Sequence, residues 1–253
     1  MEMPSANDSH VPSESLAQAP LLPVGVLFAK TWERFTKRLS LYLSIMAIPV
    51  LISLIVFVLS STTDAGFGSA LVGLILVVLV IVQLLSTIAL TYAALASEQI
   101  TLEVAYKKGL ELFFPYLLIT ILTAVAIIGG LIILIIPGLI ALVWFAFAPY
   151  ILISENERGF EALSRSRNYV KGRWFPVAGR LFALIGVFFI AALVLGLLAA
   201  GFSNSTEPTF FDSLIEIFFM LFGTPFMISY LAVLYGNVKE STVSPSVSGP
   251  AAS

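Results

Sequence analysis

The feature that most constrains this chain is an apolar run from Ala124 to Ile153, 30 residues without a charged residue or Ser, Thr, Asn or Gln. A single helix of this length would extend about 45 Å, whereas the hydrocarbon core of a bilayer is about 30 Å thick. Counted from Phe114, the mostly apolar stretch has 40 residues, which is the length of two spans. We therefore predict two membrane helices joined by a tight turn, either at Pro137-Gly138 or at Gly129-Gly130.

The composition excludes a soluble domain and leaves little material for catalysis. Hydrophobic residues make up 59% of the chain and charged residues 11%, against about 25% charged in globular proteins. There is no cysteine, and the single histidine, His10, lies in a polar segment. We therefore expect no metal site, no cofactor and no catalytic residues.

Further apolar segments complete the membrane domain, and each hairpin follows a basic amphipathic segment. The expected spans outside the central run cover about 41–60, 70–96, 175–200 and 214–235. The amphipathic segments cover 21–39, 98–113 and 154–174, and we place them on the membrane surface because they are too charged to cross it. The predicted fold is all-α and polytopic, with six transmembrane helices in three hairpins and amphipathic cytoplasmic-surface helices.

The basic residues indicate the orientation. All 13 Lys and Arg fall on one side of this arrangement, and the polar loops at 61–69 and 201–209 contain none. The positive-inside rule then places both termini in the cytoplasm. The polar ends, 1–20 and 239–253, are expected to be disordered tails around a transmembrane domain at 21–238.

The segment 154–174 is the candidate contact surface for anionic lipid headgroups or a protein partner. The residues concerned are Arg165, Arg167, Lys171 and Arg173. The simpler interpretation is a solvated face with an i,i+4 pair between Glu161 and Arg165. Arg167 falls within the apolar stripe, where Glu98 or Glu103 of another surface helix would be its partner.

Three polar residues lie within the predicted spans. Gln83, near the middle of its span, either contacts a substrate or packs through a hydrogen bond to a neighbouring helix. Glu216 is either functional or lies at the outer interface. Arg180 enters its span from the inner side and is expected to extend its guanidinium to the headgroups. Thr224-Pro225 and Pro149 are expected to kink their helices.

One block of the sequence resembles a family of prokaryotic six-helix integral membrane proteins. The relatives of that family include the membrane domain attached to some glycerophosphoryl diester phosphodiesterases. The resemblance rests on the motifs at 136–139, 148–150, 154–156, 161–166 and 170–174, with Thr224-Pro225 and Leu234-Tyr235 in agreement. It implies a multi-pass protein of a prokaryotic plasma (inner) membrane. It implies no catalytic residues, because the phosphodiesterase of those relatives is a separate soluble domain.

The functional expectation is a non-enzymatic membrane protein that acts in an accessory or assembly role by binding lipid or a protein partner at its basic cytoplasmic face. The alternative is a transporter or channel for a small or lipid-like substrate, which would need a cavity reaching Gln83 or Glu216. Nucleic acid is not expected as a partner, because the basic residues of 30–38 line an amphipathic membrane-surface helix.

Overall fold

The computed structural model describes residues 20–62, 67–202 and 210–243, which form helices and no strands. The helices are α1 (Val24–Lys37), α2 (Leu39–Thr62), α3 (Phe67–Leu95), α4 (Leu102–Ile133), α5 (Ile135–Phe145), α6 (Ala148–Glu155), α7 (Gly159–Val170), α8 (Trp174–Phe202), α9 (Phe210–Phe218), the π-helix η1 (Phe219–Gly223) and α10 (Thr224–Val243).

Six helical segments in this part of the chain are long and apolar enough to cross a membrane. They are Leu39–Leu59, Ala70–Leu95, Leu102–Ile133, Ile135–Glu155, Trp174–Leu198 and Leu214–Thr242. Each agrees with a predicted span, apart from shifts at the ends. The prediction of an all-α, multi-pass membrane protein with six spans is therefore confirmed.

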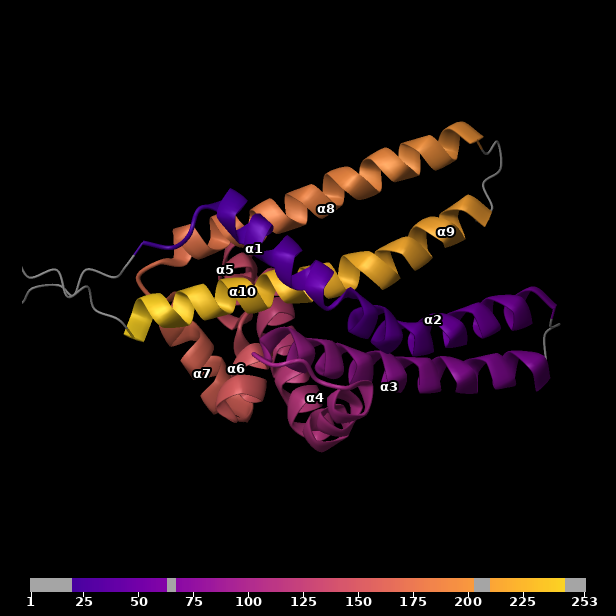
Figure 1. The fold of residues 1–253 in the computed structure, drawn as a ribbon, viewed down its shortest axis with the longest axis horizontal. Coiled ribbons are helices and arrows are strands. Elements are labelled where there is room, and N and C mark those ends of the chain that lie inside the picture. Colours follow the sequence, from indigo (N-terminus) through magenta and orange to yellow (C-terminus); the bar gives the residue numbers. More distant parts are fainter. Residues whose placement is uncertain (1–19, 63–66, 203–209, 244–253) are drawn as a thin grey trace, which may run out of the picture.

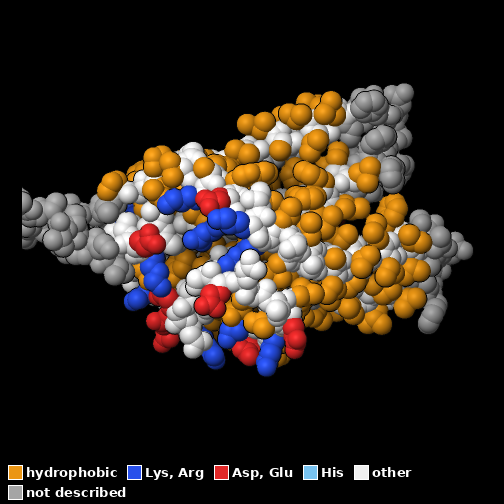
Figure 2. Space-filling view, in the orientation of Figure 1, with side chains coloured by type: hydrophobic (Ala, Val, Ile, Leu, Met, Phe, Trp, Pro, Cys, Tyr) orange, Lys and Arg blue, Asp and Glu red, His pale blue; other side chains and the backbone are white. Residues whose placement is uncertain are grey.

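The charged side chains gather at one end of the molecule, which we call the polar end. In Figure 1 the start of α1 and the end of α10 both lie at this end, on the left, while α2, α3, α8 and α9 extend to the right. Figure 2 shows Lys, Arg, Asp and Glu concentrated over the left half and an apolar surface over the right. A membrane-spanning protein needs this segregation, because charges in the hydrocarbon core are costly.

The middle amphipathic segment is not a separate surface helix, contrary to the prediction for 98–113. It forms the first turns of α4, which begins at the N-cap Thr101 and continues through Pro115 to Ile133. The buried residues of α4 follow one another at spacings of four and three: Ala105, Gly109, Leu112, Tyr116 and Ile119. Because this stripe crosses Pro115 without a change of phase, packing keeps the helix in one piece.

The turn between α4 and α5 lies at neither of the predicted glycine or proline pairs. It is at Leu134, whose backbone is extended (φ −163°, ψ 153°). Pro137 falls in the first turn of α5, where its missing N–H leaves no hydrogen bond unmade. Gly130 and Gly138 instead allow close helix contact, since a Cβ on Gly130 would lie 2.8 Å from the Cα of Gly138.

The last span is longer than predicted. Residues 239–243, which we assigned to a C-terminal tail, continue α10 to Val243. The guanidinium of Arg173 binds the hydroxyl and the carbonyl oxygen of Ser241, so the end of this helix is held to the start of α8. The rest of the predicted tails, 1–19 and 244–253, lies outside the described residues.

Candidate functional site

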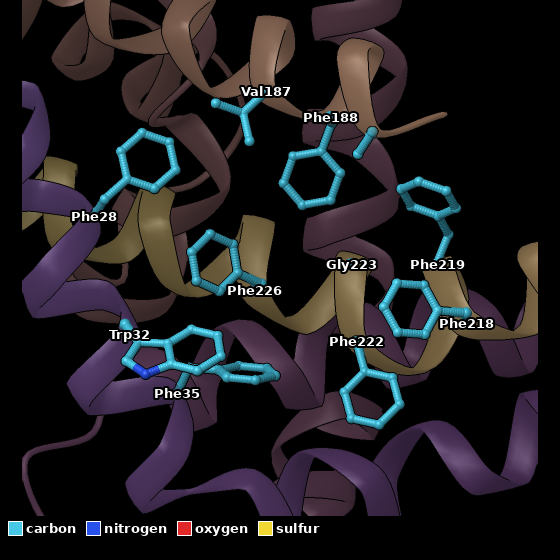
Figure 3. A pocket seen from close by; sticks show the side chains of 11 residues that line it. Phe28, Trp32, Phe35, Val187, Phe188, Phe218, Phe219, Phe222, Gly223 and Phe226 are labelled. Carbon is cyan, nitrogen blue, oxygen red and sulfur yellow. The ribbon is translucent and has the colours of Figure 1, made fainter. Parts of the chain in front are cut away.

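A cavity of about 440 Å³ lies where α1, α8 and the η1–α10 junction meet. We call it the aromatic groove, because eight of the side chains that line it are aromatic. These are Phe28, Trp32, Phe35, Phe188, Phe218, Phe219, Phe222 and Phe226. Figure 3 shows Phe28, Trp32 and Phe35 on one side of this space, Phe188 on another, and Phe226 between them.

The amphipathic pattern of α1 places its aromatic residues in this groove. Leu27, Thr31 and Phe35 form the buried stripe, and Thr31 satisfies its hydroxyl by donating to the Leu27 carbonyl at 2.7 Å. The ring of Phe28 lies 4.9 Å from that of Tyr230, and Phe35 meets Phe226 edge-on at 5.6 Å. The predicted surface helix at the N-terminal end therefore packs against α10.

Arg180, which we expected to reach lipid headgroups, attaches the segment before α1. Its Nε donates to the Leu22 carbonyl at 2.9 Å and its Nη2 to the Leu21 carbonyl at 2.9 Å. The N–H of Leu22 donates in turn to Oδ1 of Asn237 at 3.0 Å. Backbone carbonyls that no helix satisfies thus become the partners of this half-buried guanidinium.

The last span changes its helical pitch beside the groove. The backbone N–H of Thr224 donates to the carbonyl of Phe219, five residues back, and Pro225 cannot donate at all. Gly223 fits beneath the ring of Phe188, because a Cβ there would approach Cε1 of that ring to 3.0 Å. The predicted interruption at Thr224-Pro225 is therefore a π-helical turn, a feature often found at functional sites.

A second cavity of about 360 Å³ adjoins the groove and shares Phe188, Phe219 and Gly223 with it. We call it the polar cavity, because Gln83 from α3 and Glu216 from α9 both line it. Oε1 of Gln83 is buried and accepts no hydrogen bond from the residues that the structure describes. Two residues that the sequence marked separately therefore share one site.

Glu155, at the end of α6, is the centre of a cluster that sequence reasoning missed. Its side chain is 11% exposed and accepts from the hydroxyls of Tyr235 at 2.6 Å and Tyr169 at 2.7 Å. Lys239 at 2.9 Å and Arg165 at 3.1 Å complete the set. Burial and the bond to Glu155 raise the pKa of Tyr169. The only available signal was that Glu155 is the first charge after the apolar run.

The four predicted headgroup contacts occupy different environments. Arg165 pairs with Glu155 rather than with Glu161. Arg167 lies over the ring of Trp144, 4.5 Å from its centroid, and not beside Glu98 or Glu103. Arg173 is 5% exposed, and this burial lowers its pKa.

Arg167 and Lys171 both keep exposed side chains without an ion pair among the residues described. Arg165, Arg167 and Lys171 are therefore exposed, and of the four only Arg173 is buried.

Comparisons of the chain with models of protein families, with curated proteins and with solved structures found no match. The site is therefore interpreted from its own geometry.

Proposed function

We propose that this protein is a non-enzymatic lipid-binding membrane protein, and that an acyl chain of an anionic phospholipid occupies the aromatic groove. The observation that carries the proposal is the groove itself, an aromatic cavity with one wall formed by the basic amphipathic helix α1. Its volume is within the range of small-molecule sites, about 300–1,000 Å³. Anionic lipid remains the expected partner, and we place the headgroup of the lipid in the groove against α1.

The surroundings of the groove favour an acyl chain over a buried protein segment. Trp32 is 60% exposed and Phe218 51% exposed, so aromatic side chains from two of its walls also face the membrane. Rings and alkyl chains associate there through dispersion and apolar contact.

The basic residues of α1 supply the headgroup contact. Lys30 and Arg34 lie one turn apart and are exposed, on a different side of the helix from the groove residues Phe28 and Phe35. Lys37 is engaged with Glu33 at 2.6 Å. An amphipathic helix with this division lies at the boundary between headgroups and acyl chains, and each such basic residue adds attraction for anionic lipid.

Native mass spectrometry of the full chain with phosphatidylglycerol and phosphatidylcholine tests the proposal. Ala191→Phe places a ring in the groove, while Ala192→Phe adds the same ring at the next, exposed position of α8. We expect phosphatidylglycerol binding to fall about tenfold in the first variant, about 1.4 kcal/mol, and to stay unchanged in the second. Equal lipid retention by both variants would refute the groove as the site.

The headgroup contact has its own control. Lys30→Gln with Arg34→Gln should remove the preference for phosphatidylglycerol over phosphatidylcholine, whereas Lys107→Gln with Lys171→Gln, also exposed, should keep it. If both pairs lose the preference equally, the contact is a general charge effect and not a site on α1.

The polar cavity favours a second candidate function, the transport of a small or lipid-like substrate. This candidate rests on the observation that Gln83 and Glu216 line one cavity. Transport through the membrane domain would require such a cavity with polar contacts for the substrate. Flux into proteoliposomes should then fall in Gln83→Leu and in Glu216→Gln. Unchanged flux in both variants would leave this alternative without its polar contacts.

We propose that the polar end faces the cytoplasm of a prokaryotic cell, with the plasma (inner) membrane as the location. The positive-inside rule supports this orientation, and the resemblance to the six-helix family supports the location. Because the chain has no cysteine, a membrane-impermeant thiol reagent can test the orientation. In intact cells it should label Thr63→Cys and spare Ser97→Cys, and the reverse pattern would refute the orientation.

A further inference from the structure

The polar cavity contains acceptor groups for which the described part of the protein supplies no donor or counter-charge. Oε1 of Gln83 is a buried acceptor without a partner. Glu216 brings a carboxyl group to the same cavity, and none of its lining residues is Lys or Arg. A ligand with N–H donors and a positive charge would satisfy both groups.

Glu216 has no ion-pair partner within residues 20–62, 67–202 and 210–243. Arg180, the basic residue within a neighbouring span, is occupied by the carbonyls of Leu21 and Leu22. Glu216 is exposed and lies near the start of the apolar span Leu214–Thr242, and an ionisable group in a membrane span commonly marks a ligand or ion pathway. The missing counter-charge is therefore expected to come from outside this chain.

The remaining walls suit an organic cation and not a metal ion. Phe188 and Phe219, whose ring centroids are 6.2 Å apart, offer aromatic surface to an apolar body, and Met220 and Met227 are adaptable apolar neighbours. Divalent hard cations require about six or more oxygen ligands in a defined geometry, which one carboxyl and one amide do not supply.

We infer that the polar cavity binds a lipophilic ammonium compound, with its N–H groups toward Gln83 and Glu216 and its apolar body against Phe188 and Phe219. This inference names the substrate class for the second candidate function. It concerns binding, so an absence of flux together with specific binding would refute transport and leave the cavity's ligand class intact.

Equilibrium dialysis of the full chain in phosphatidylcholine nanodiscs tests the inference, with empty nanodiscs as the blank. The probes are 4-phenylbutylamine, which is protonated at pH 7, 4-phenylbutanol and 4-phenylbutyrate, which share the aromatic body and differ in the polar group. We expect the amine to bind at least about tenfold more tightly than the alcohol or the acid. Equal binding of the three probes above the blank would refute a cation site.

Two matched pairs of variants assign the binding to the cavity. Glu216→Gln should weaken amine binding about tenfold, while Glu240→Gln, an exposed acid at the polar end, should not. Gln83→Leu should weaken it severalfold, and Gln99→Leu, exposed and outside the cavity, should not. If Glu216→Gln retains wild-type affinity, the inference is wrong.

The Ala191→Phe variant separates this inference from the lipid proposal. Ala191 lines the aromatic groove and not the polar cavity, so amine binding should persist where phosphatidylglycerol binding is lost. Loss of amine binding in this variant together with retention in Glu216→Gln would place the amine in the groove and refute the polar cavity as its site.

Discussion

Glu155→Gln tests whether a largely buried carboxylate, 11% exposed, holds α6, α7 and α10 together at the polar end. The substitution keeps the size and shape of the side chain and removes its charge. Four groups donate to this carboxylate in the native protein, two tyrosine hydroxyls, a lysine and an arginine. They come from α7 and α10, so the perturbation acts on contacts between helices and not on one helix alone.

The magnitude follows from how exposed the partners are. Arg165 and Lys239 have side chains 52% and 39% exposed, so solvent screening limits each ion pair to about 0–1 kcal/mol. Tyr169 and Tyr235 are buried, and a hydrogen bond to a charged group contributes about 1.5–3 kcal/mol. Since the glutamine oxygen still accepts one hydrogen bond, we expect a loss of about 2–4 kcal/mol in the free energy of unfolding.

Unfolding by SDS in mixed micelles, followed by circular dichroism, measures this loss. Glu161→Gln is the control, because Glu161 lies on α7, is exposed, and has no ion pair within the described chain. We expect it to change stability by less than about 0.5 kcal/mol. A cycle with Tyr235→Phe adds a second readout, because the two substitutions should be less than additive.

Two results would show this reasoning to be wrong. If Glu155→Gln and Glu161→Gln have the same stability, the carboxylate does not hold the cluster. If the effects of Glu155→Gln and Tyr235→Phe add fully, the hydrogen bond between these side chains does not contribute.

Two further substitutions test helix contacts. Gly130→Ala should destabilise the protein by about 1–3 kcal/mol, because its Cβ would meet backbone atoms of Gly138. Gly129→Ala, with nothing within 4 Å, should stabilise the protein by up to about 1 kcal/mol. Thermal unfolding in detergent measures both changes, and changes of the same sign would refute the close contact. Arg38→Met should lower the free energy of unfolding by about 1.5–3 kcal/mol, because Arg38 donates to the carbonyls of Ala96 at 2.8 Å and Glu98 at 2.9 Å beyond the end of α3. If Arg34→Met, at an exposed position, lowers stability by the same amount in this assay, Arg38 does not have that role.

The hydrophobic pattern alone determined the number and position of the spans. A stretch of about 20 apolar residues lowers its free energy by entering the bilayer whatever its neighbours are, and a helix satisfies its own backbone there. This explains why the central run could be divided into two helices before any contact was known. The amphipathic α1 and α7 were predictable for the same reason, since the period of their apolar residues is local.

The tertiary structure decided the breaks within helices. Leu134 carries no turn signal, yet the chain turns there because the contact between Gly130 and Gly138 sets where α4 and α5 meet. Pro115, a usual helix breaker, lies inside α4 because its neighbours continue one buried stripe. Local rules failed at both places, since packing between helices outweighs the preferences of single residues.

The roles of the polar residues were also decided by the tertiary structure. Arg173 and Arg180 resemble headgroup contacts in sequence, but their guanidinium groups satisfy backbone carbonyls at the ends of helices. Gln83 and Glu216 were each noticed, but nothing local places them in one cavity. Hydropathy is a property of each segment, so it can be calculated from the sequence. The role of a polar side chain depends on the partners that folding brings within hydrogen-bond distance.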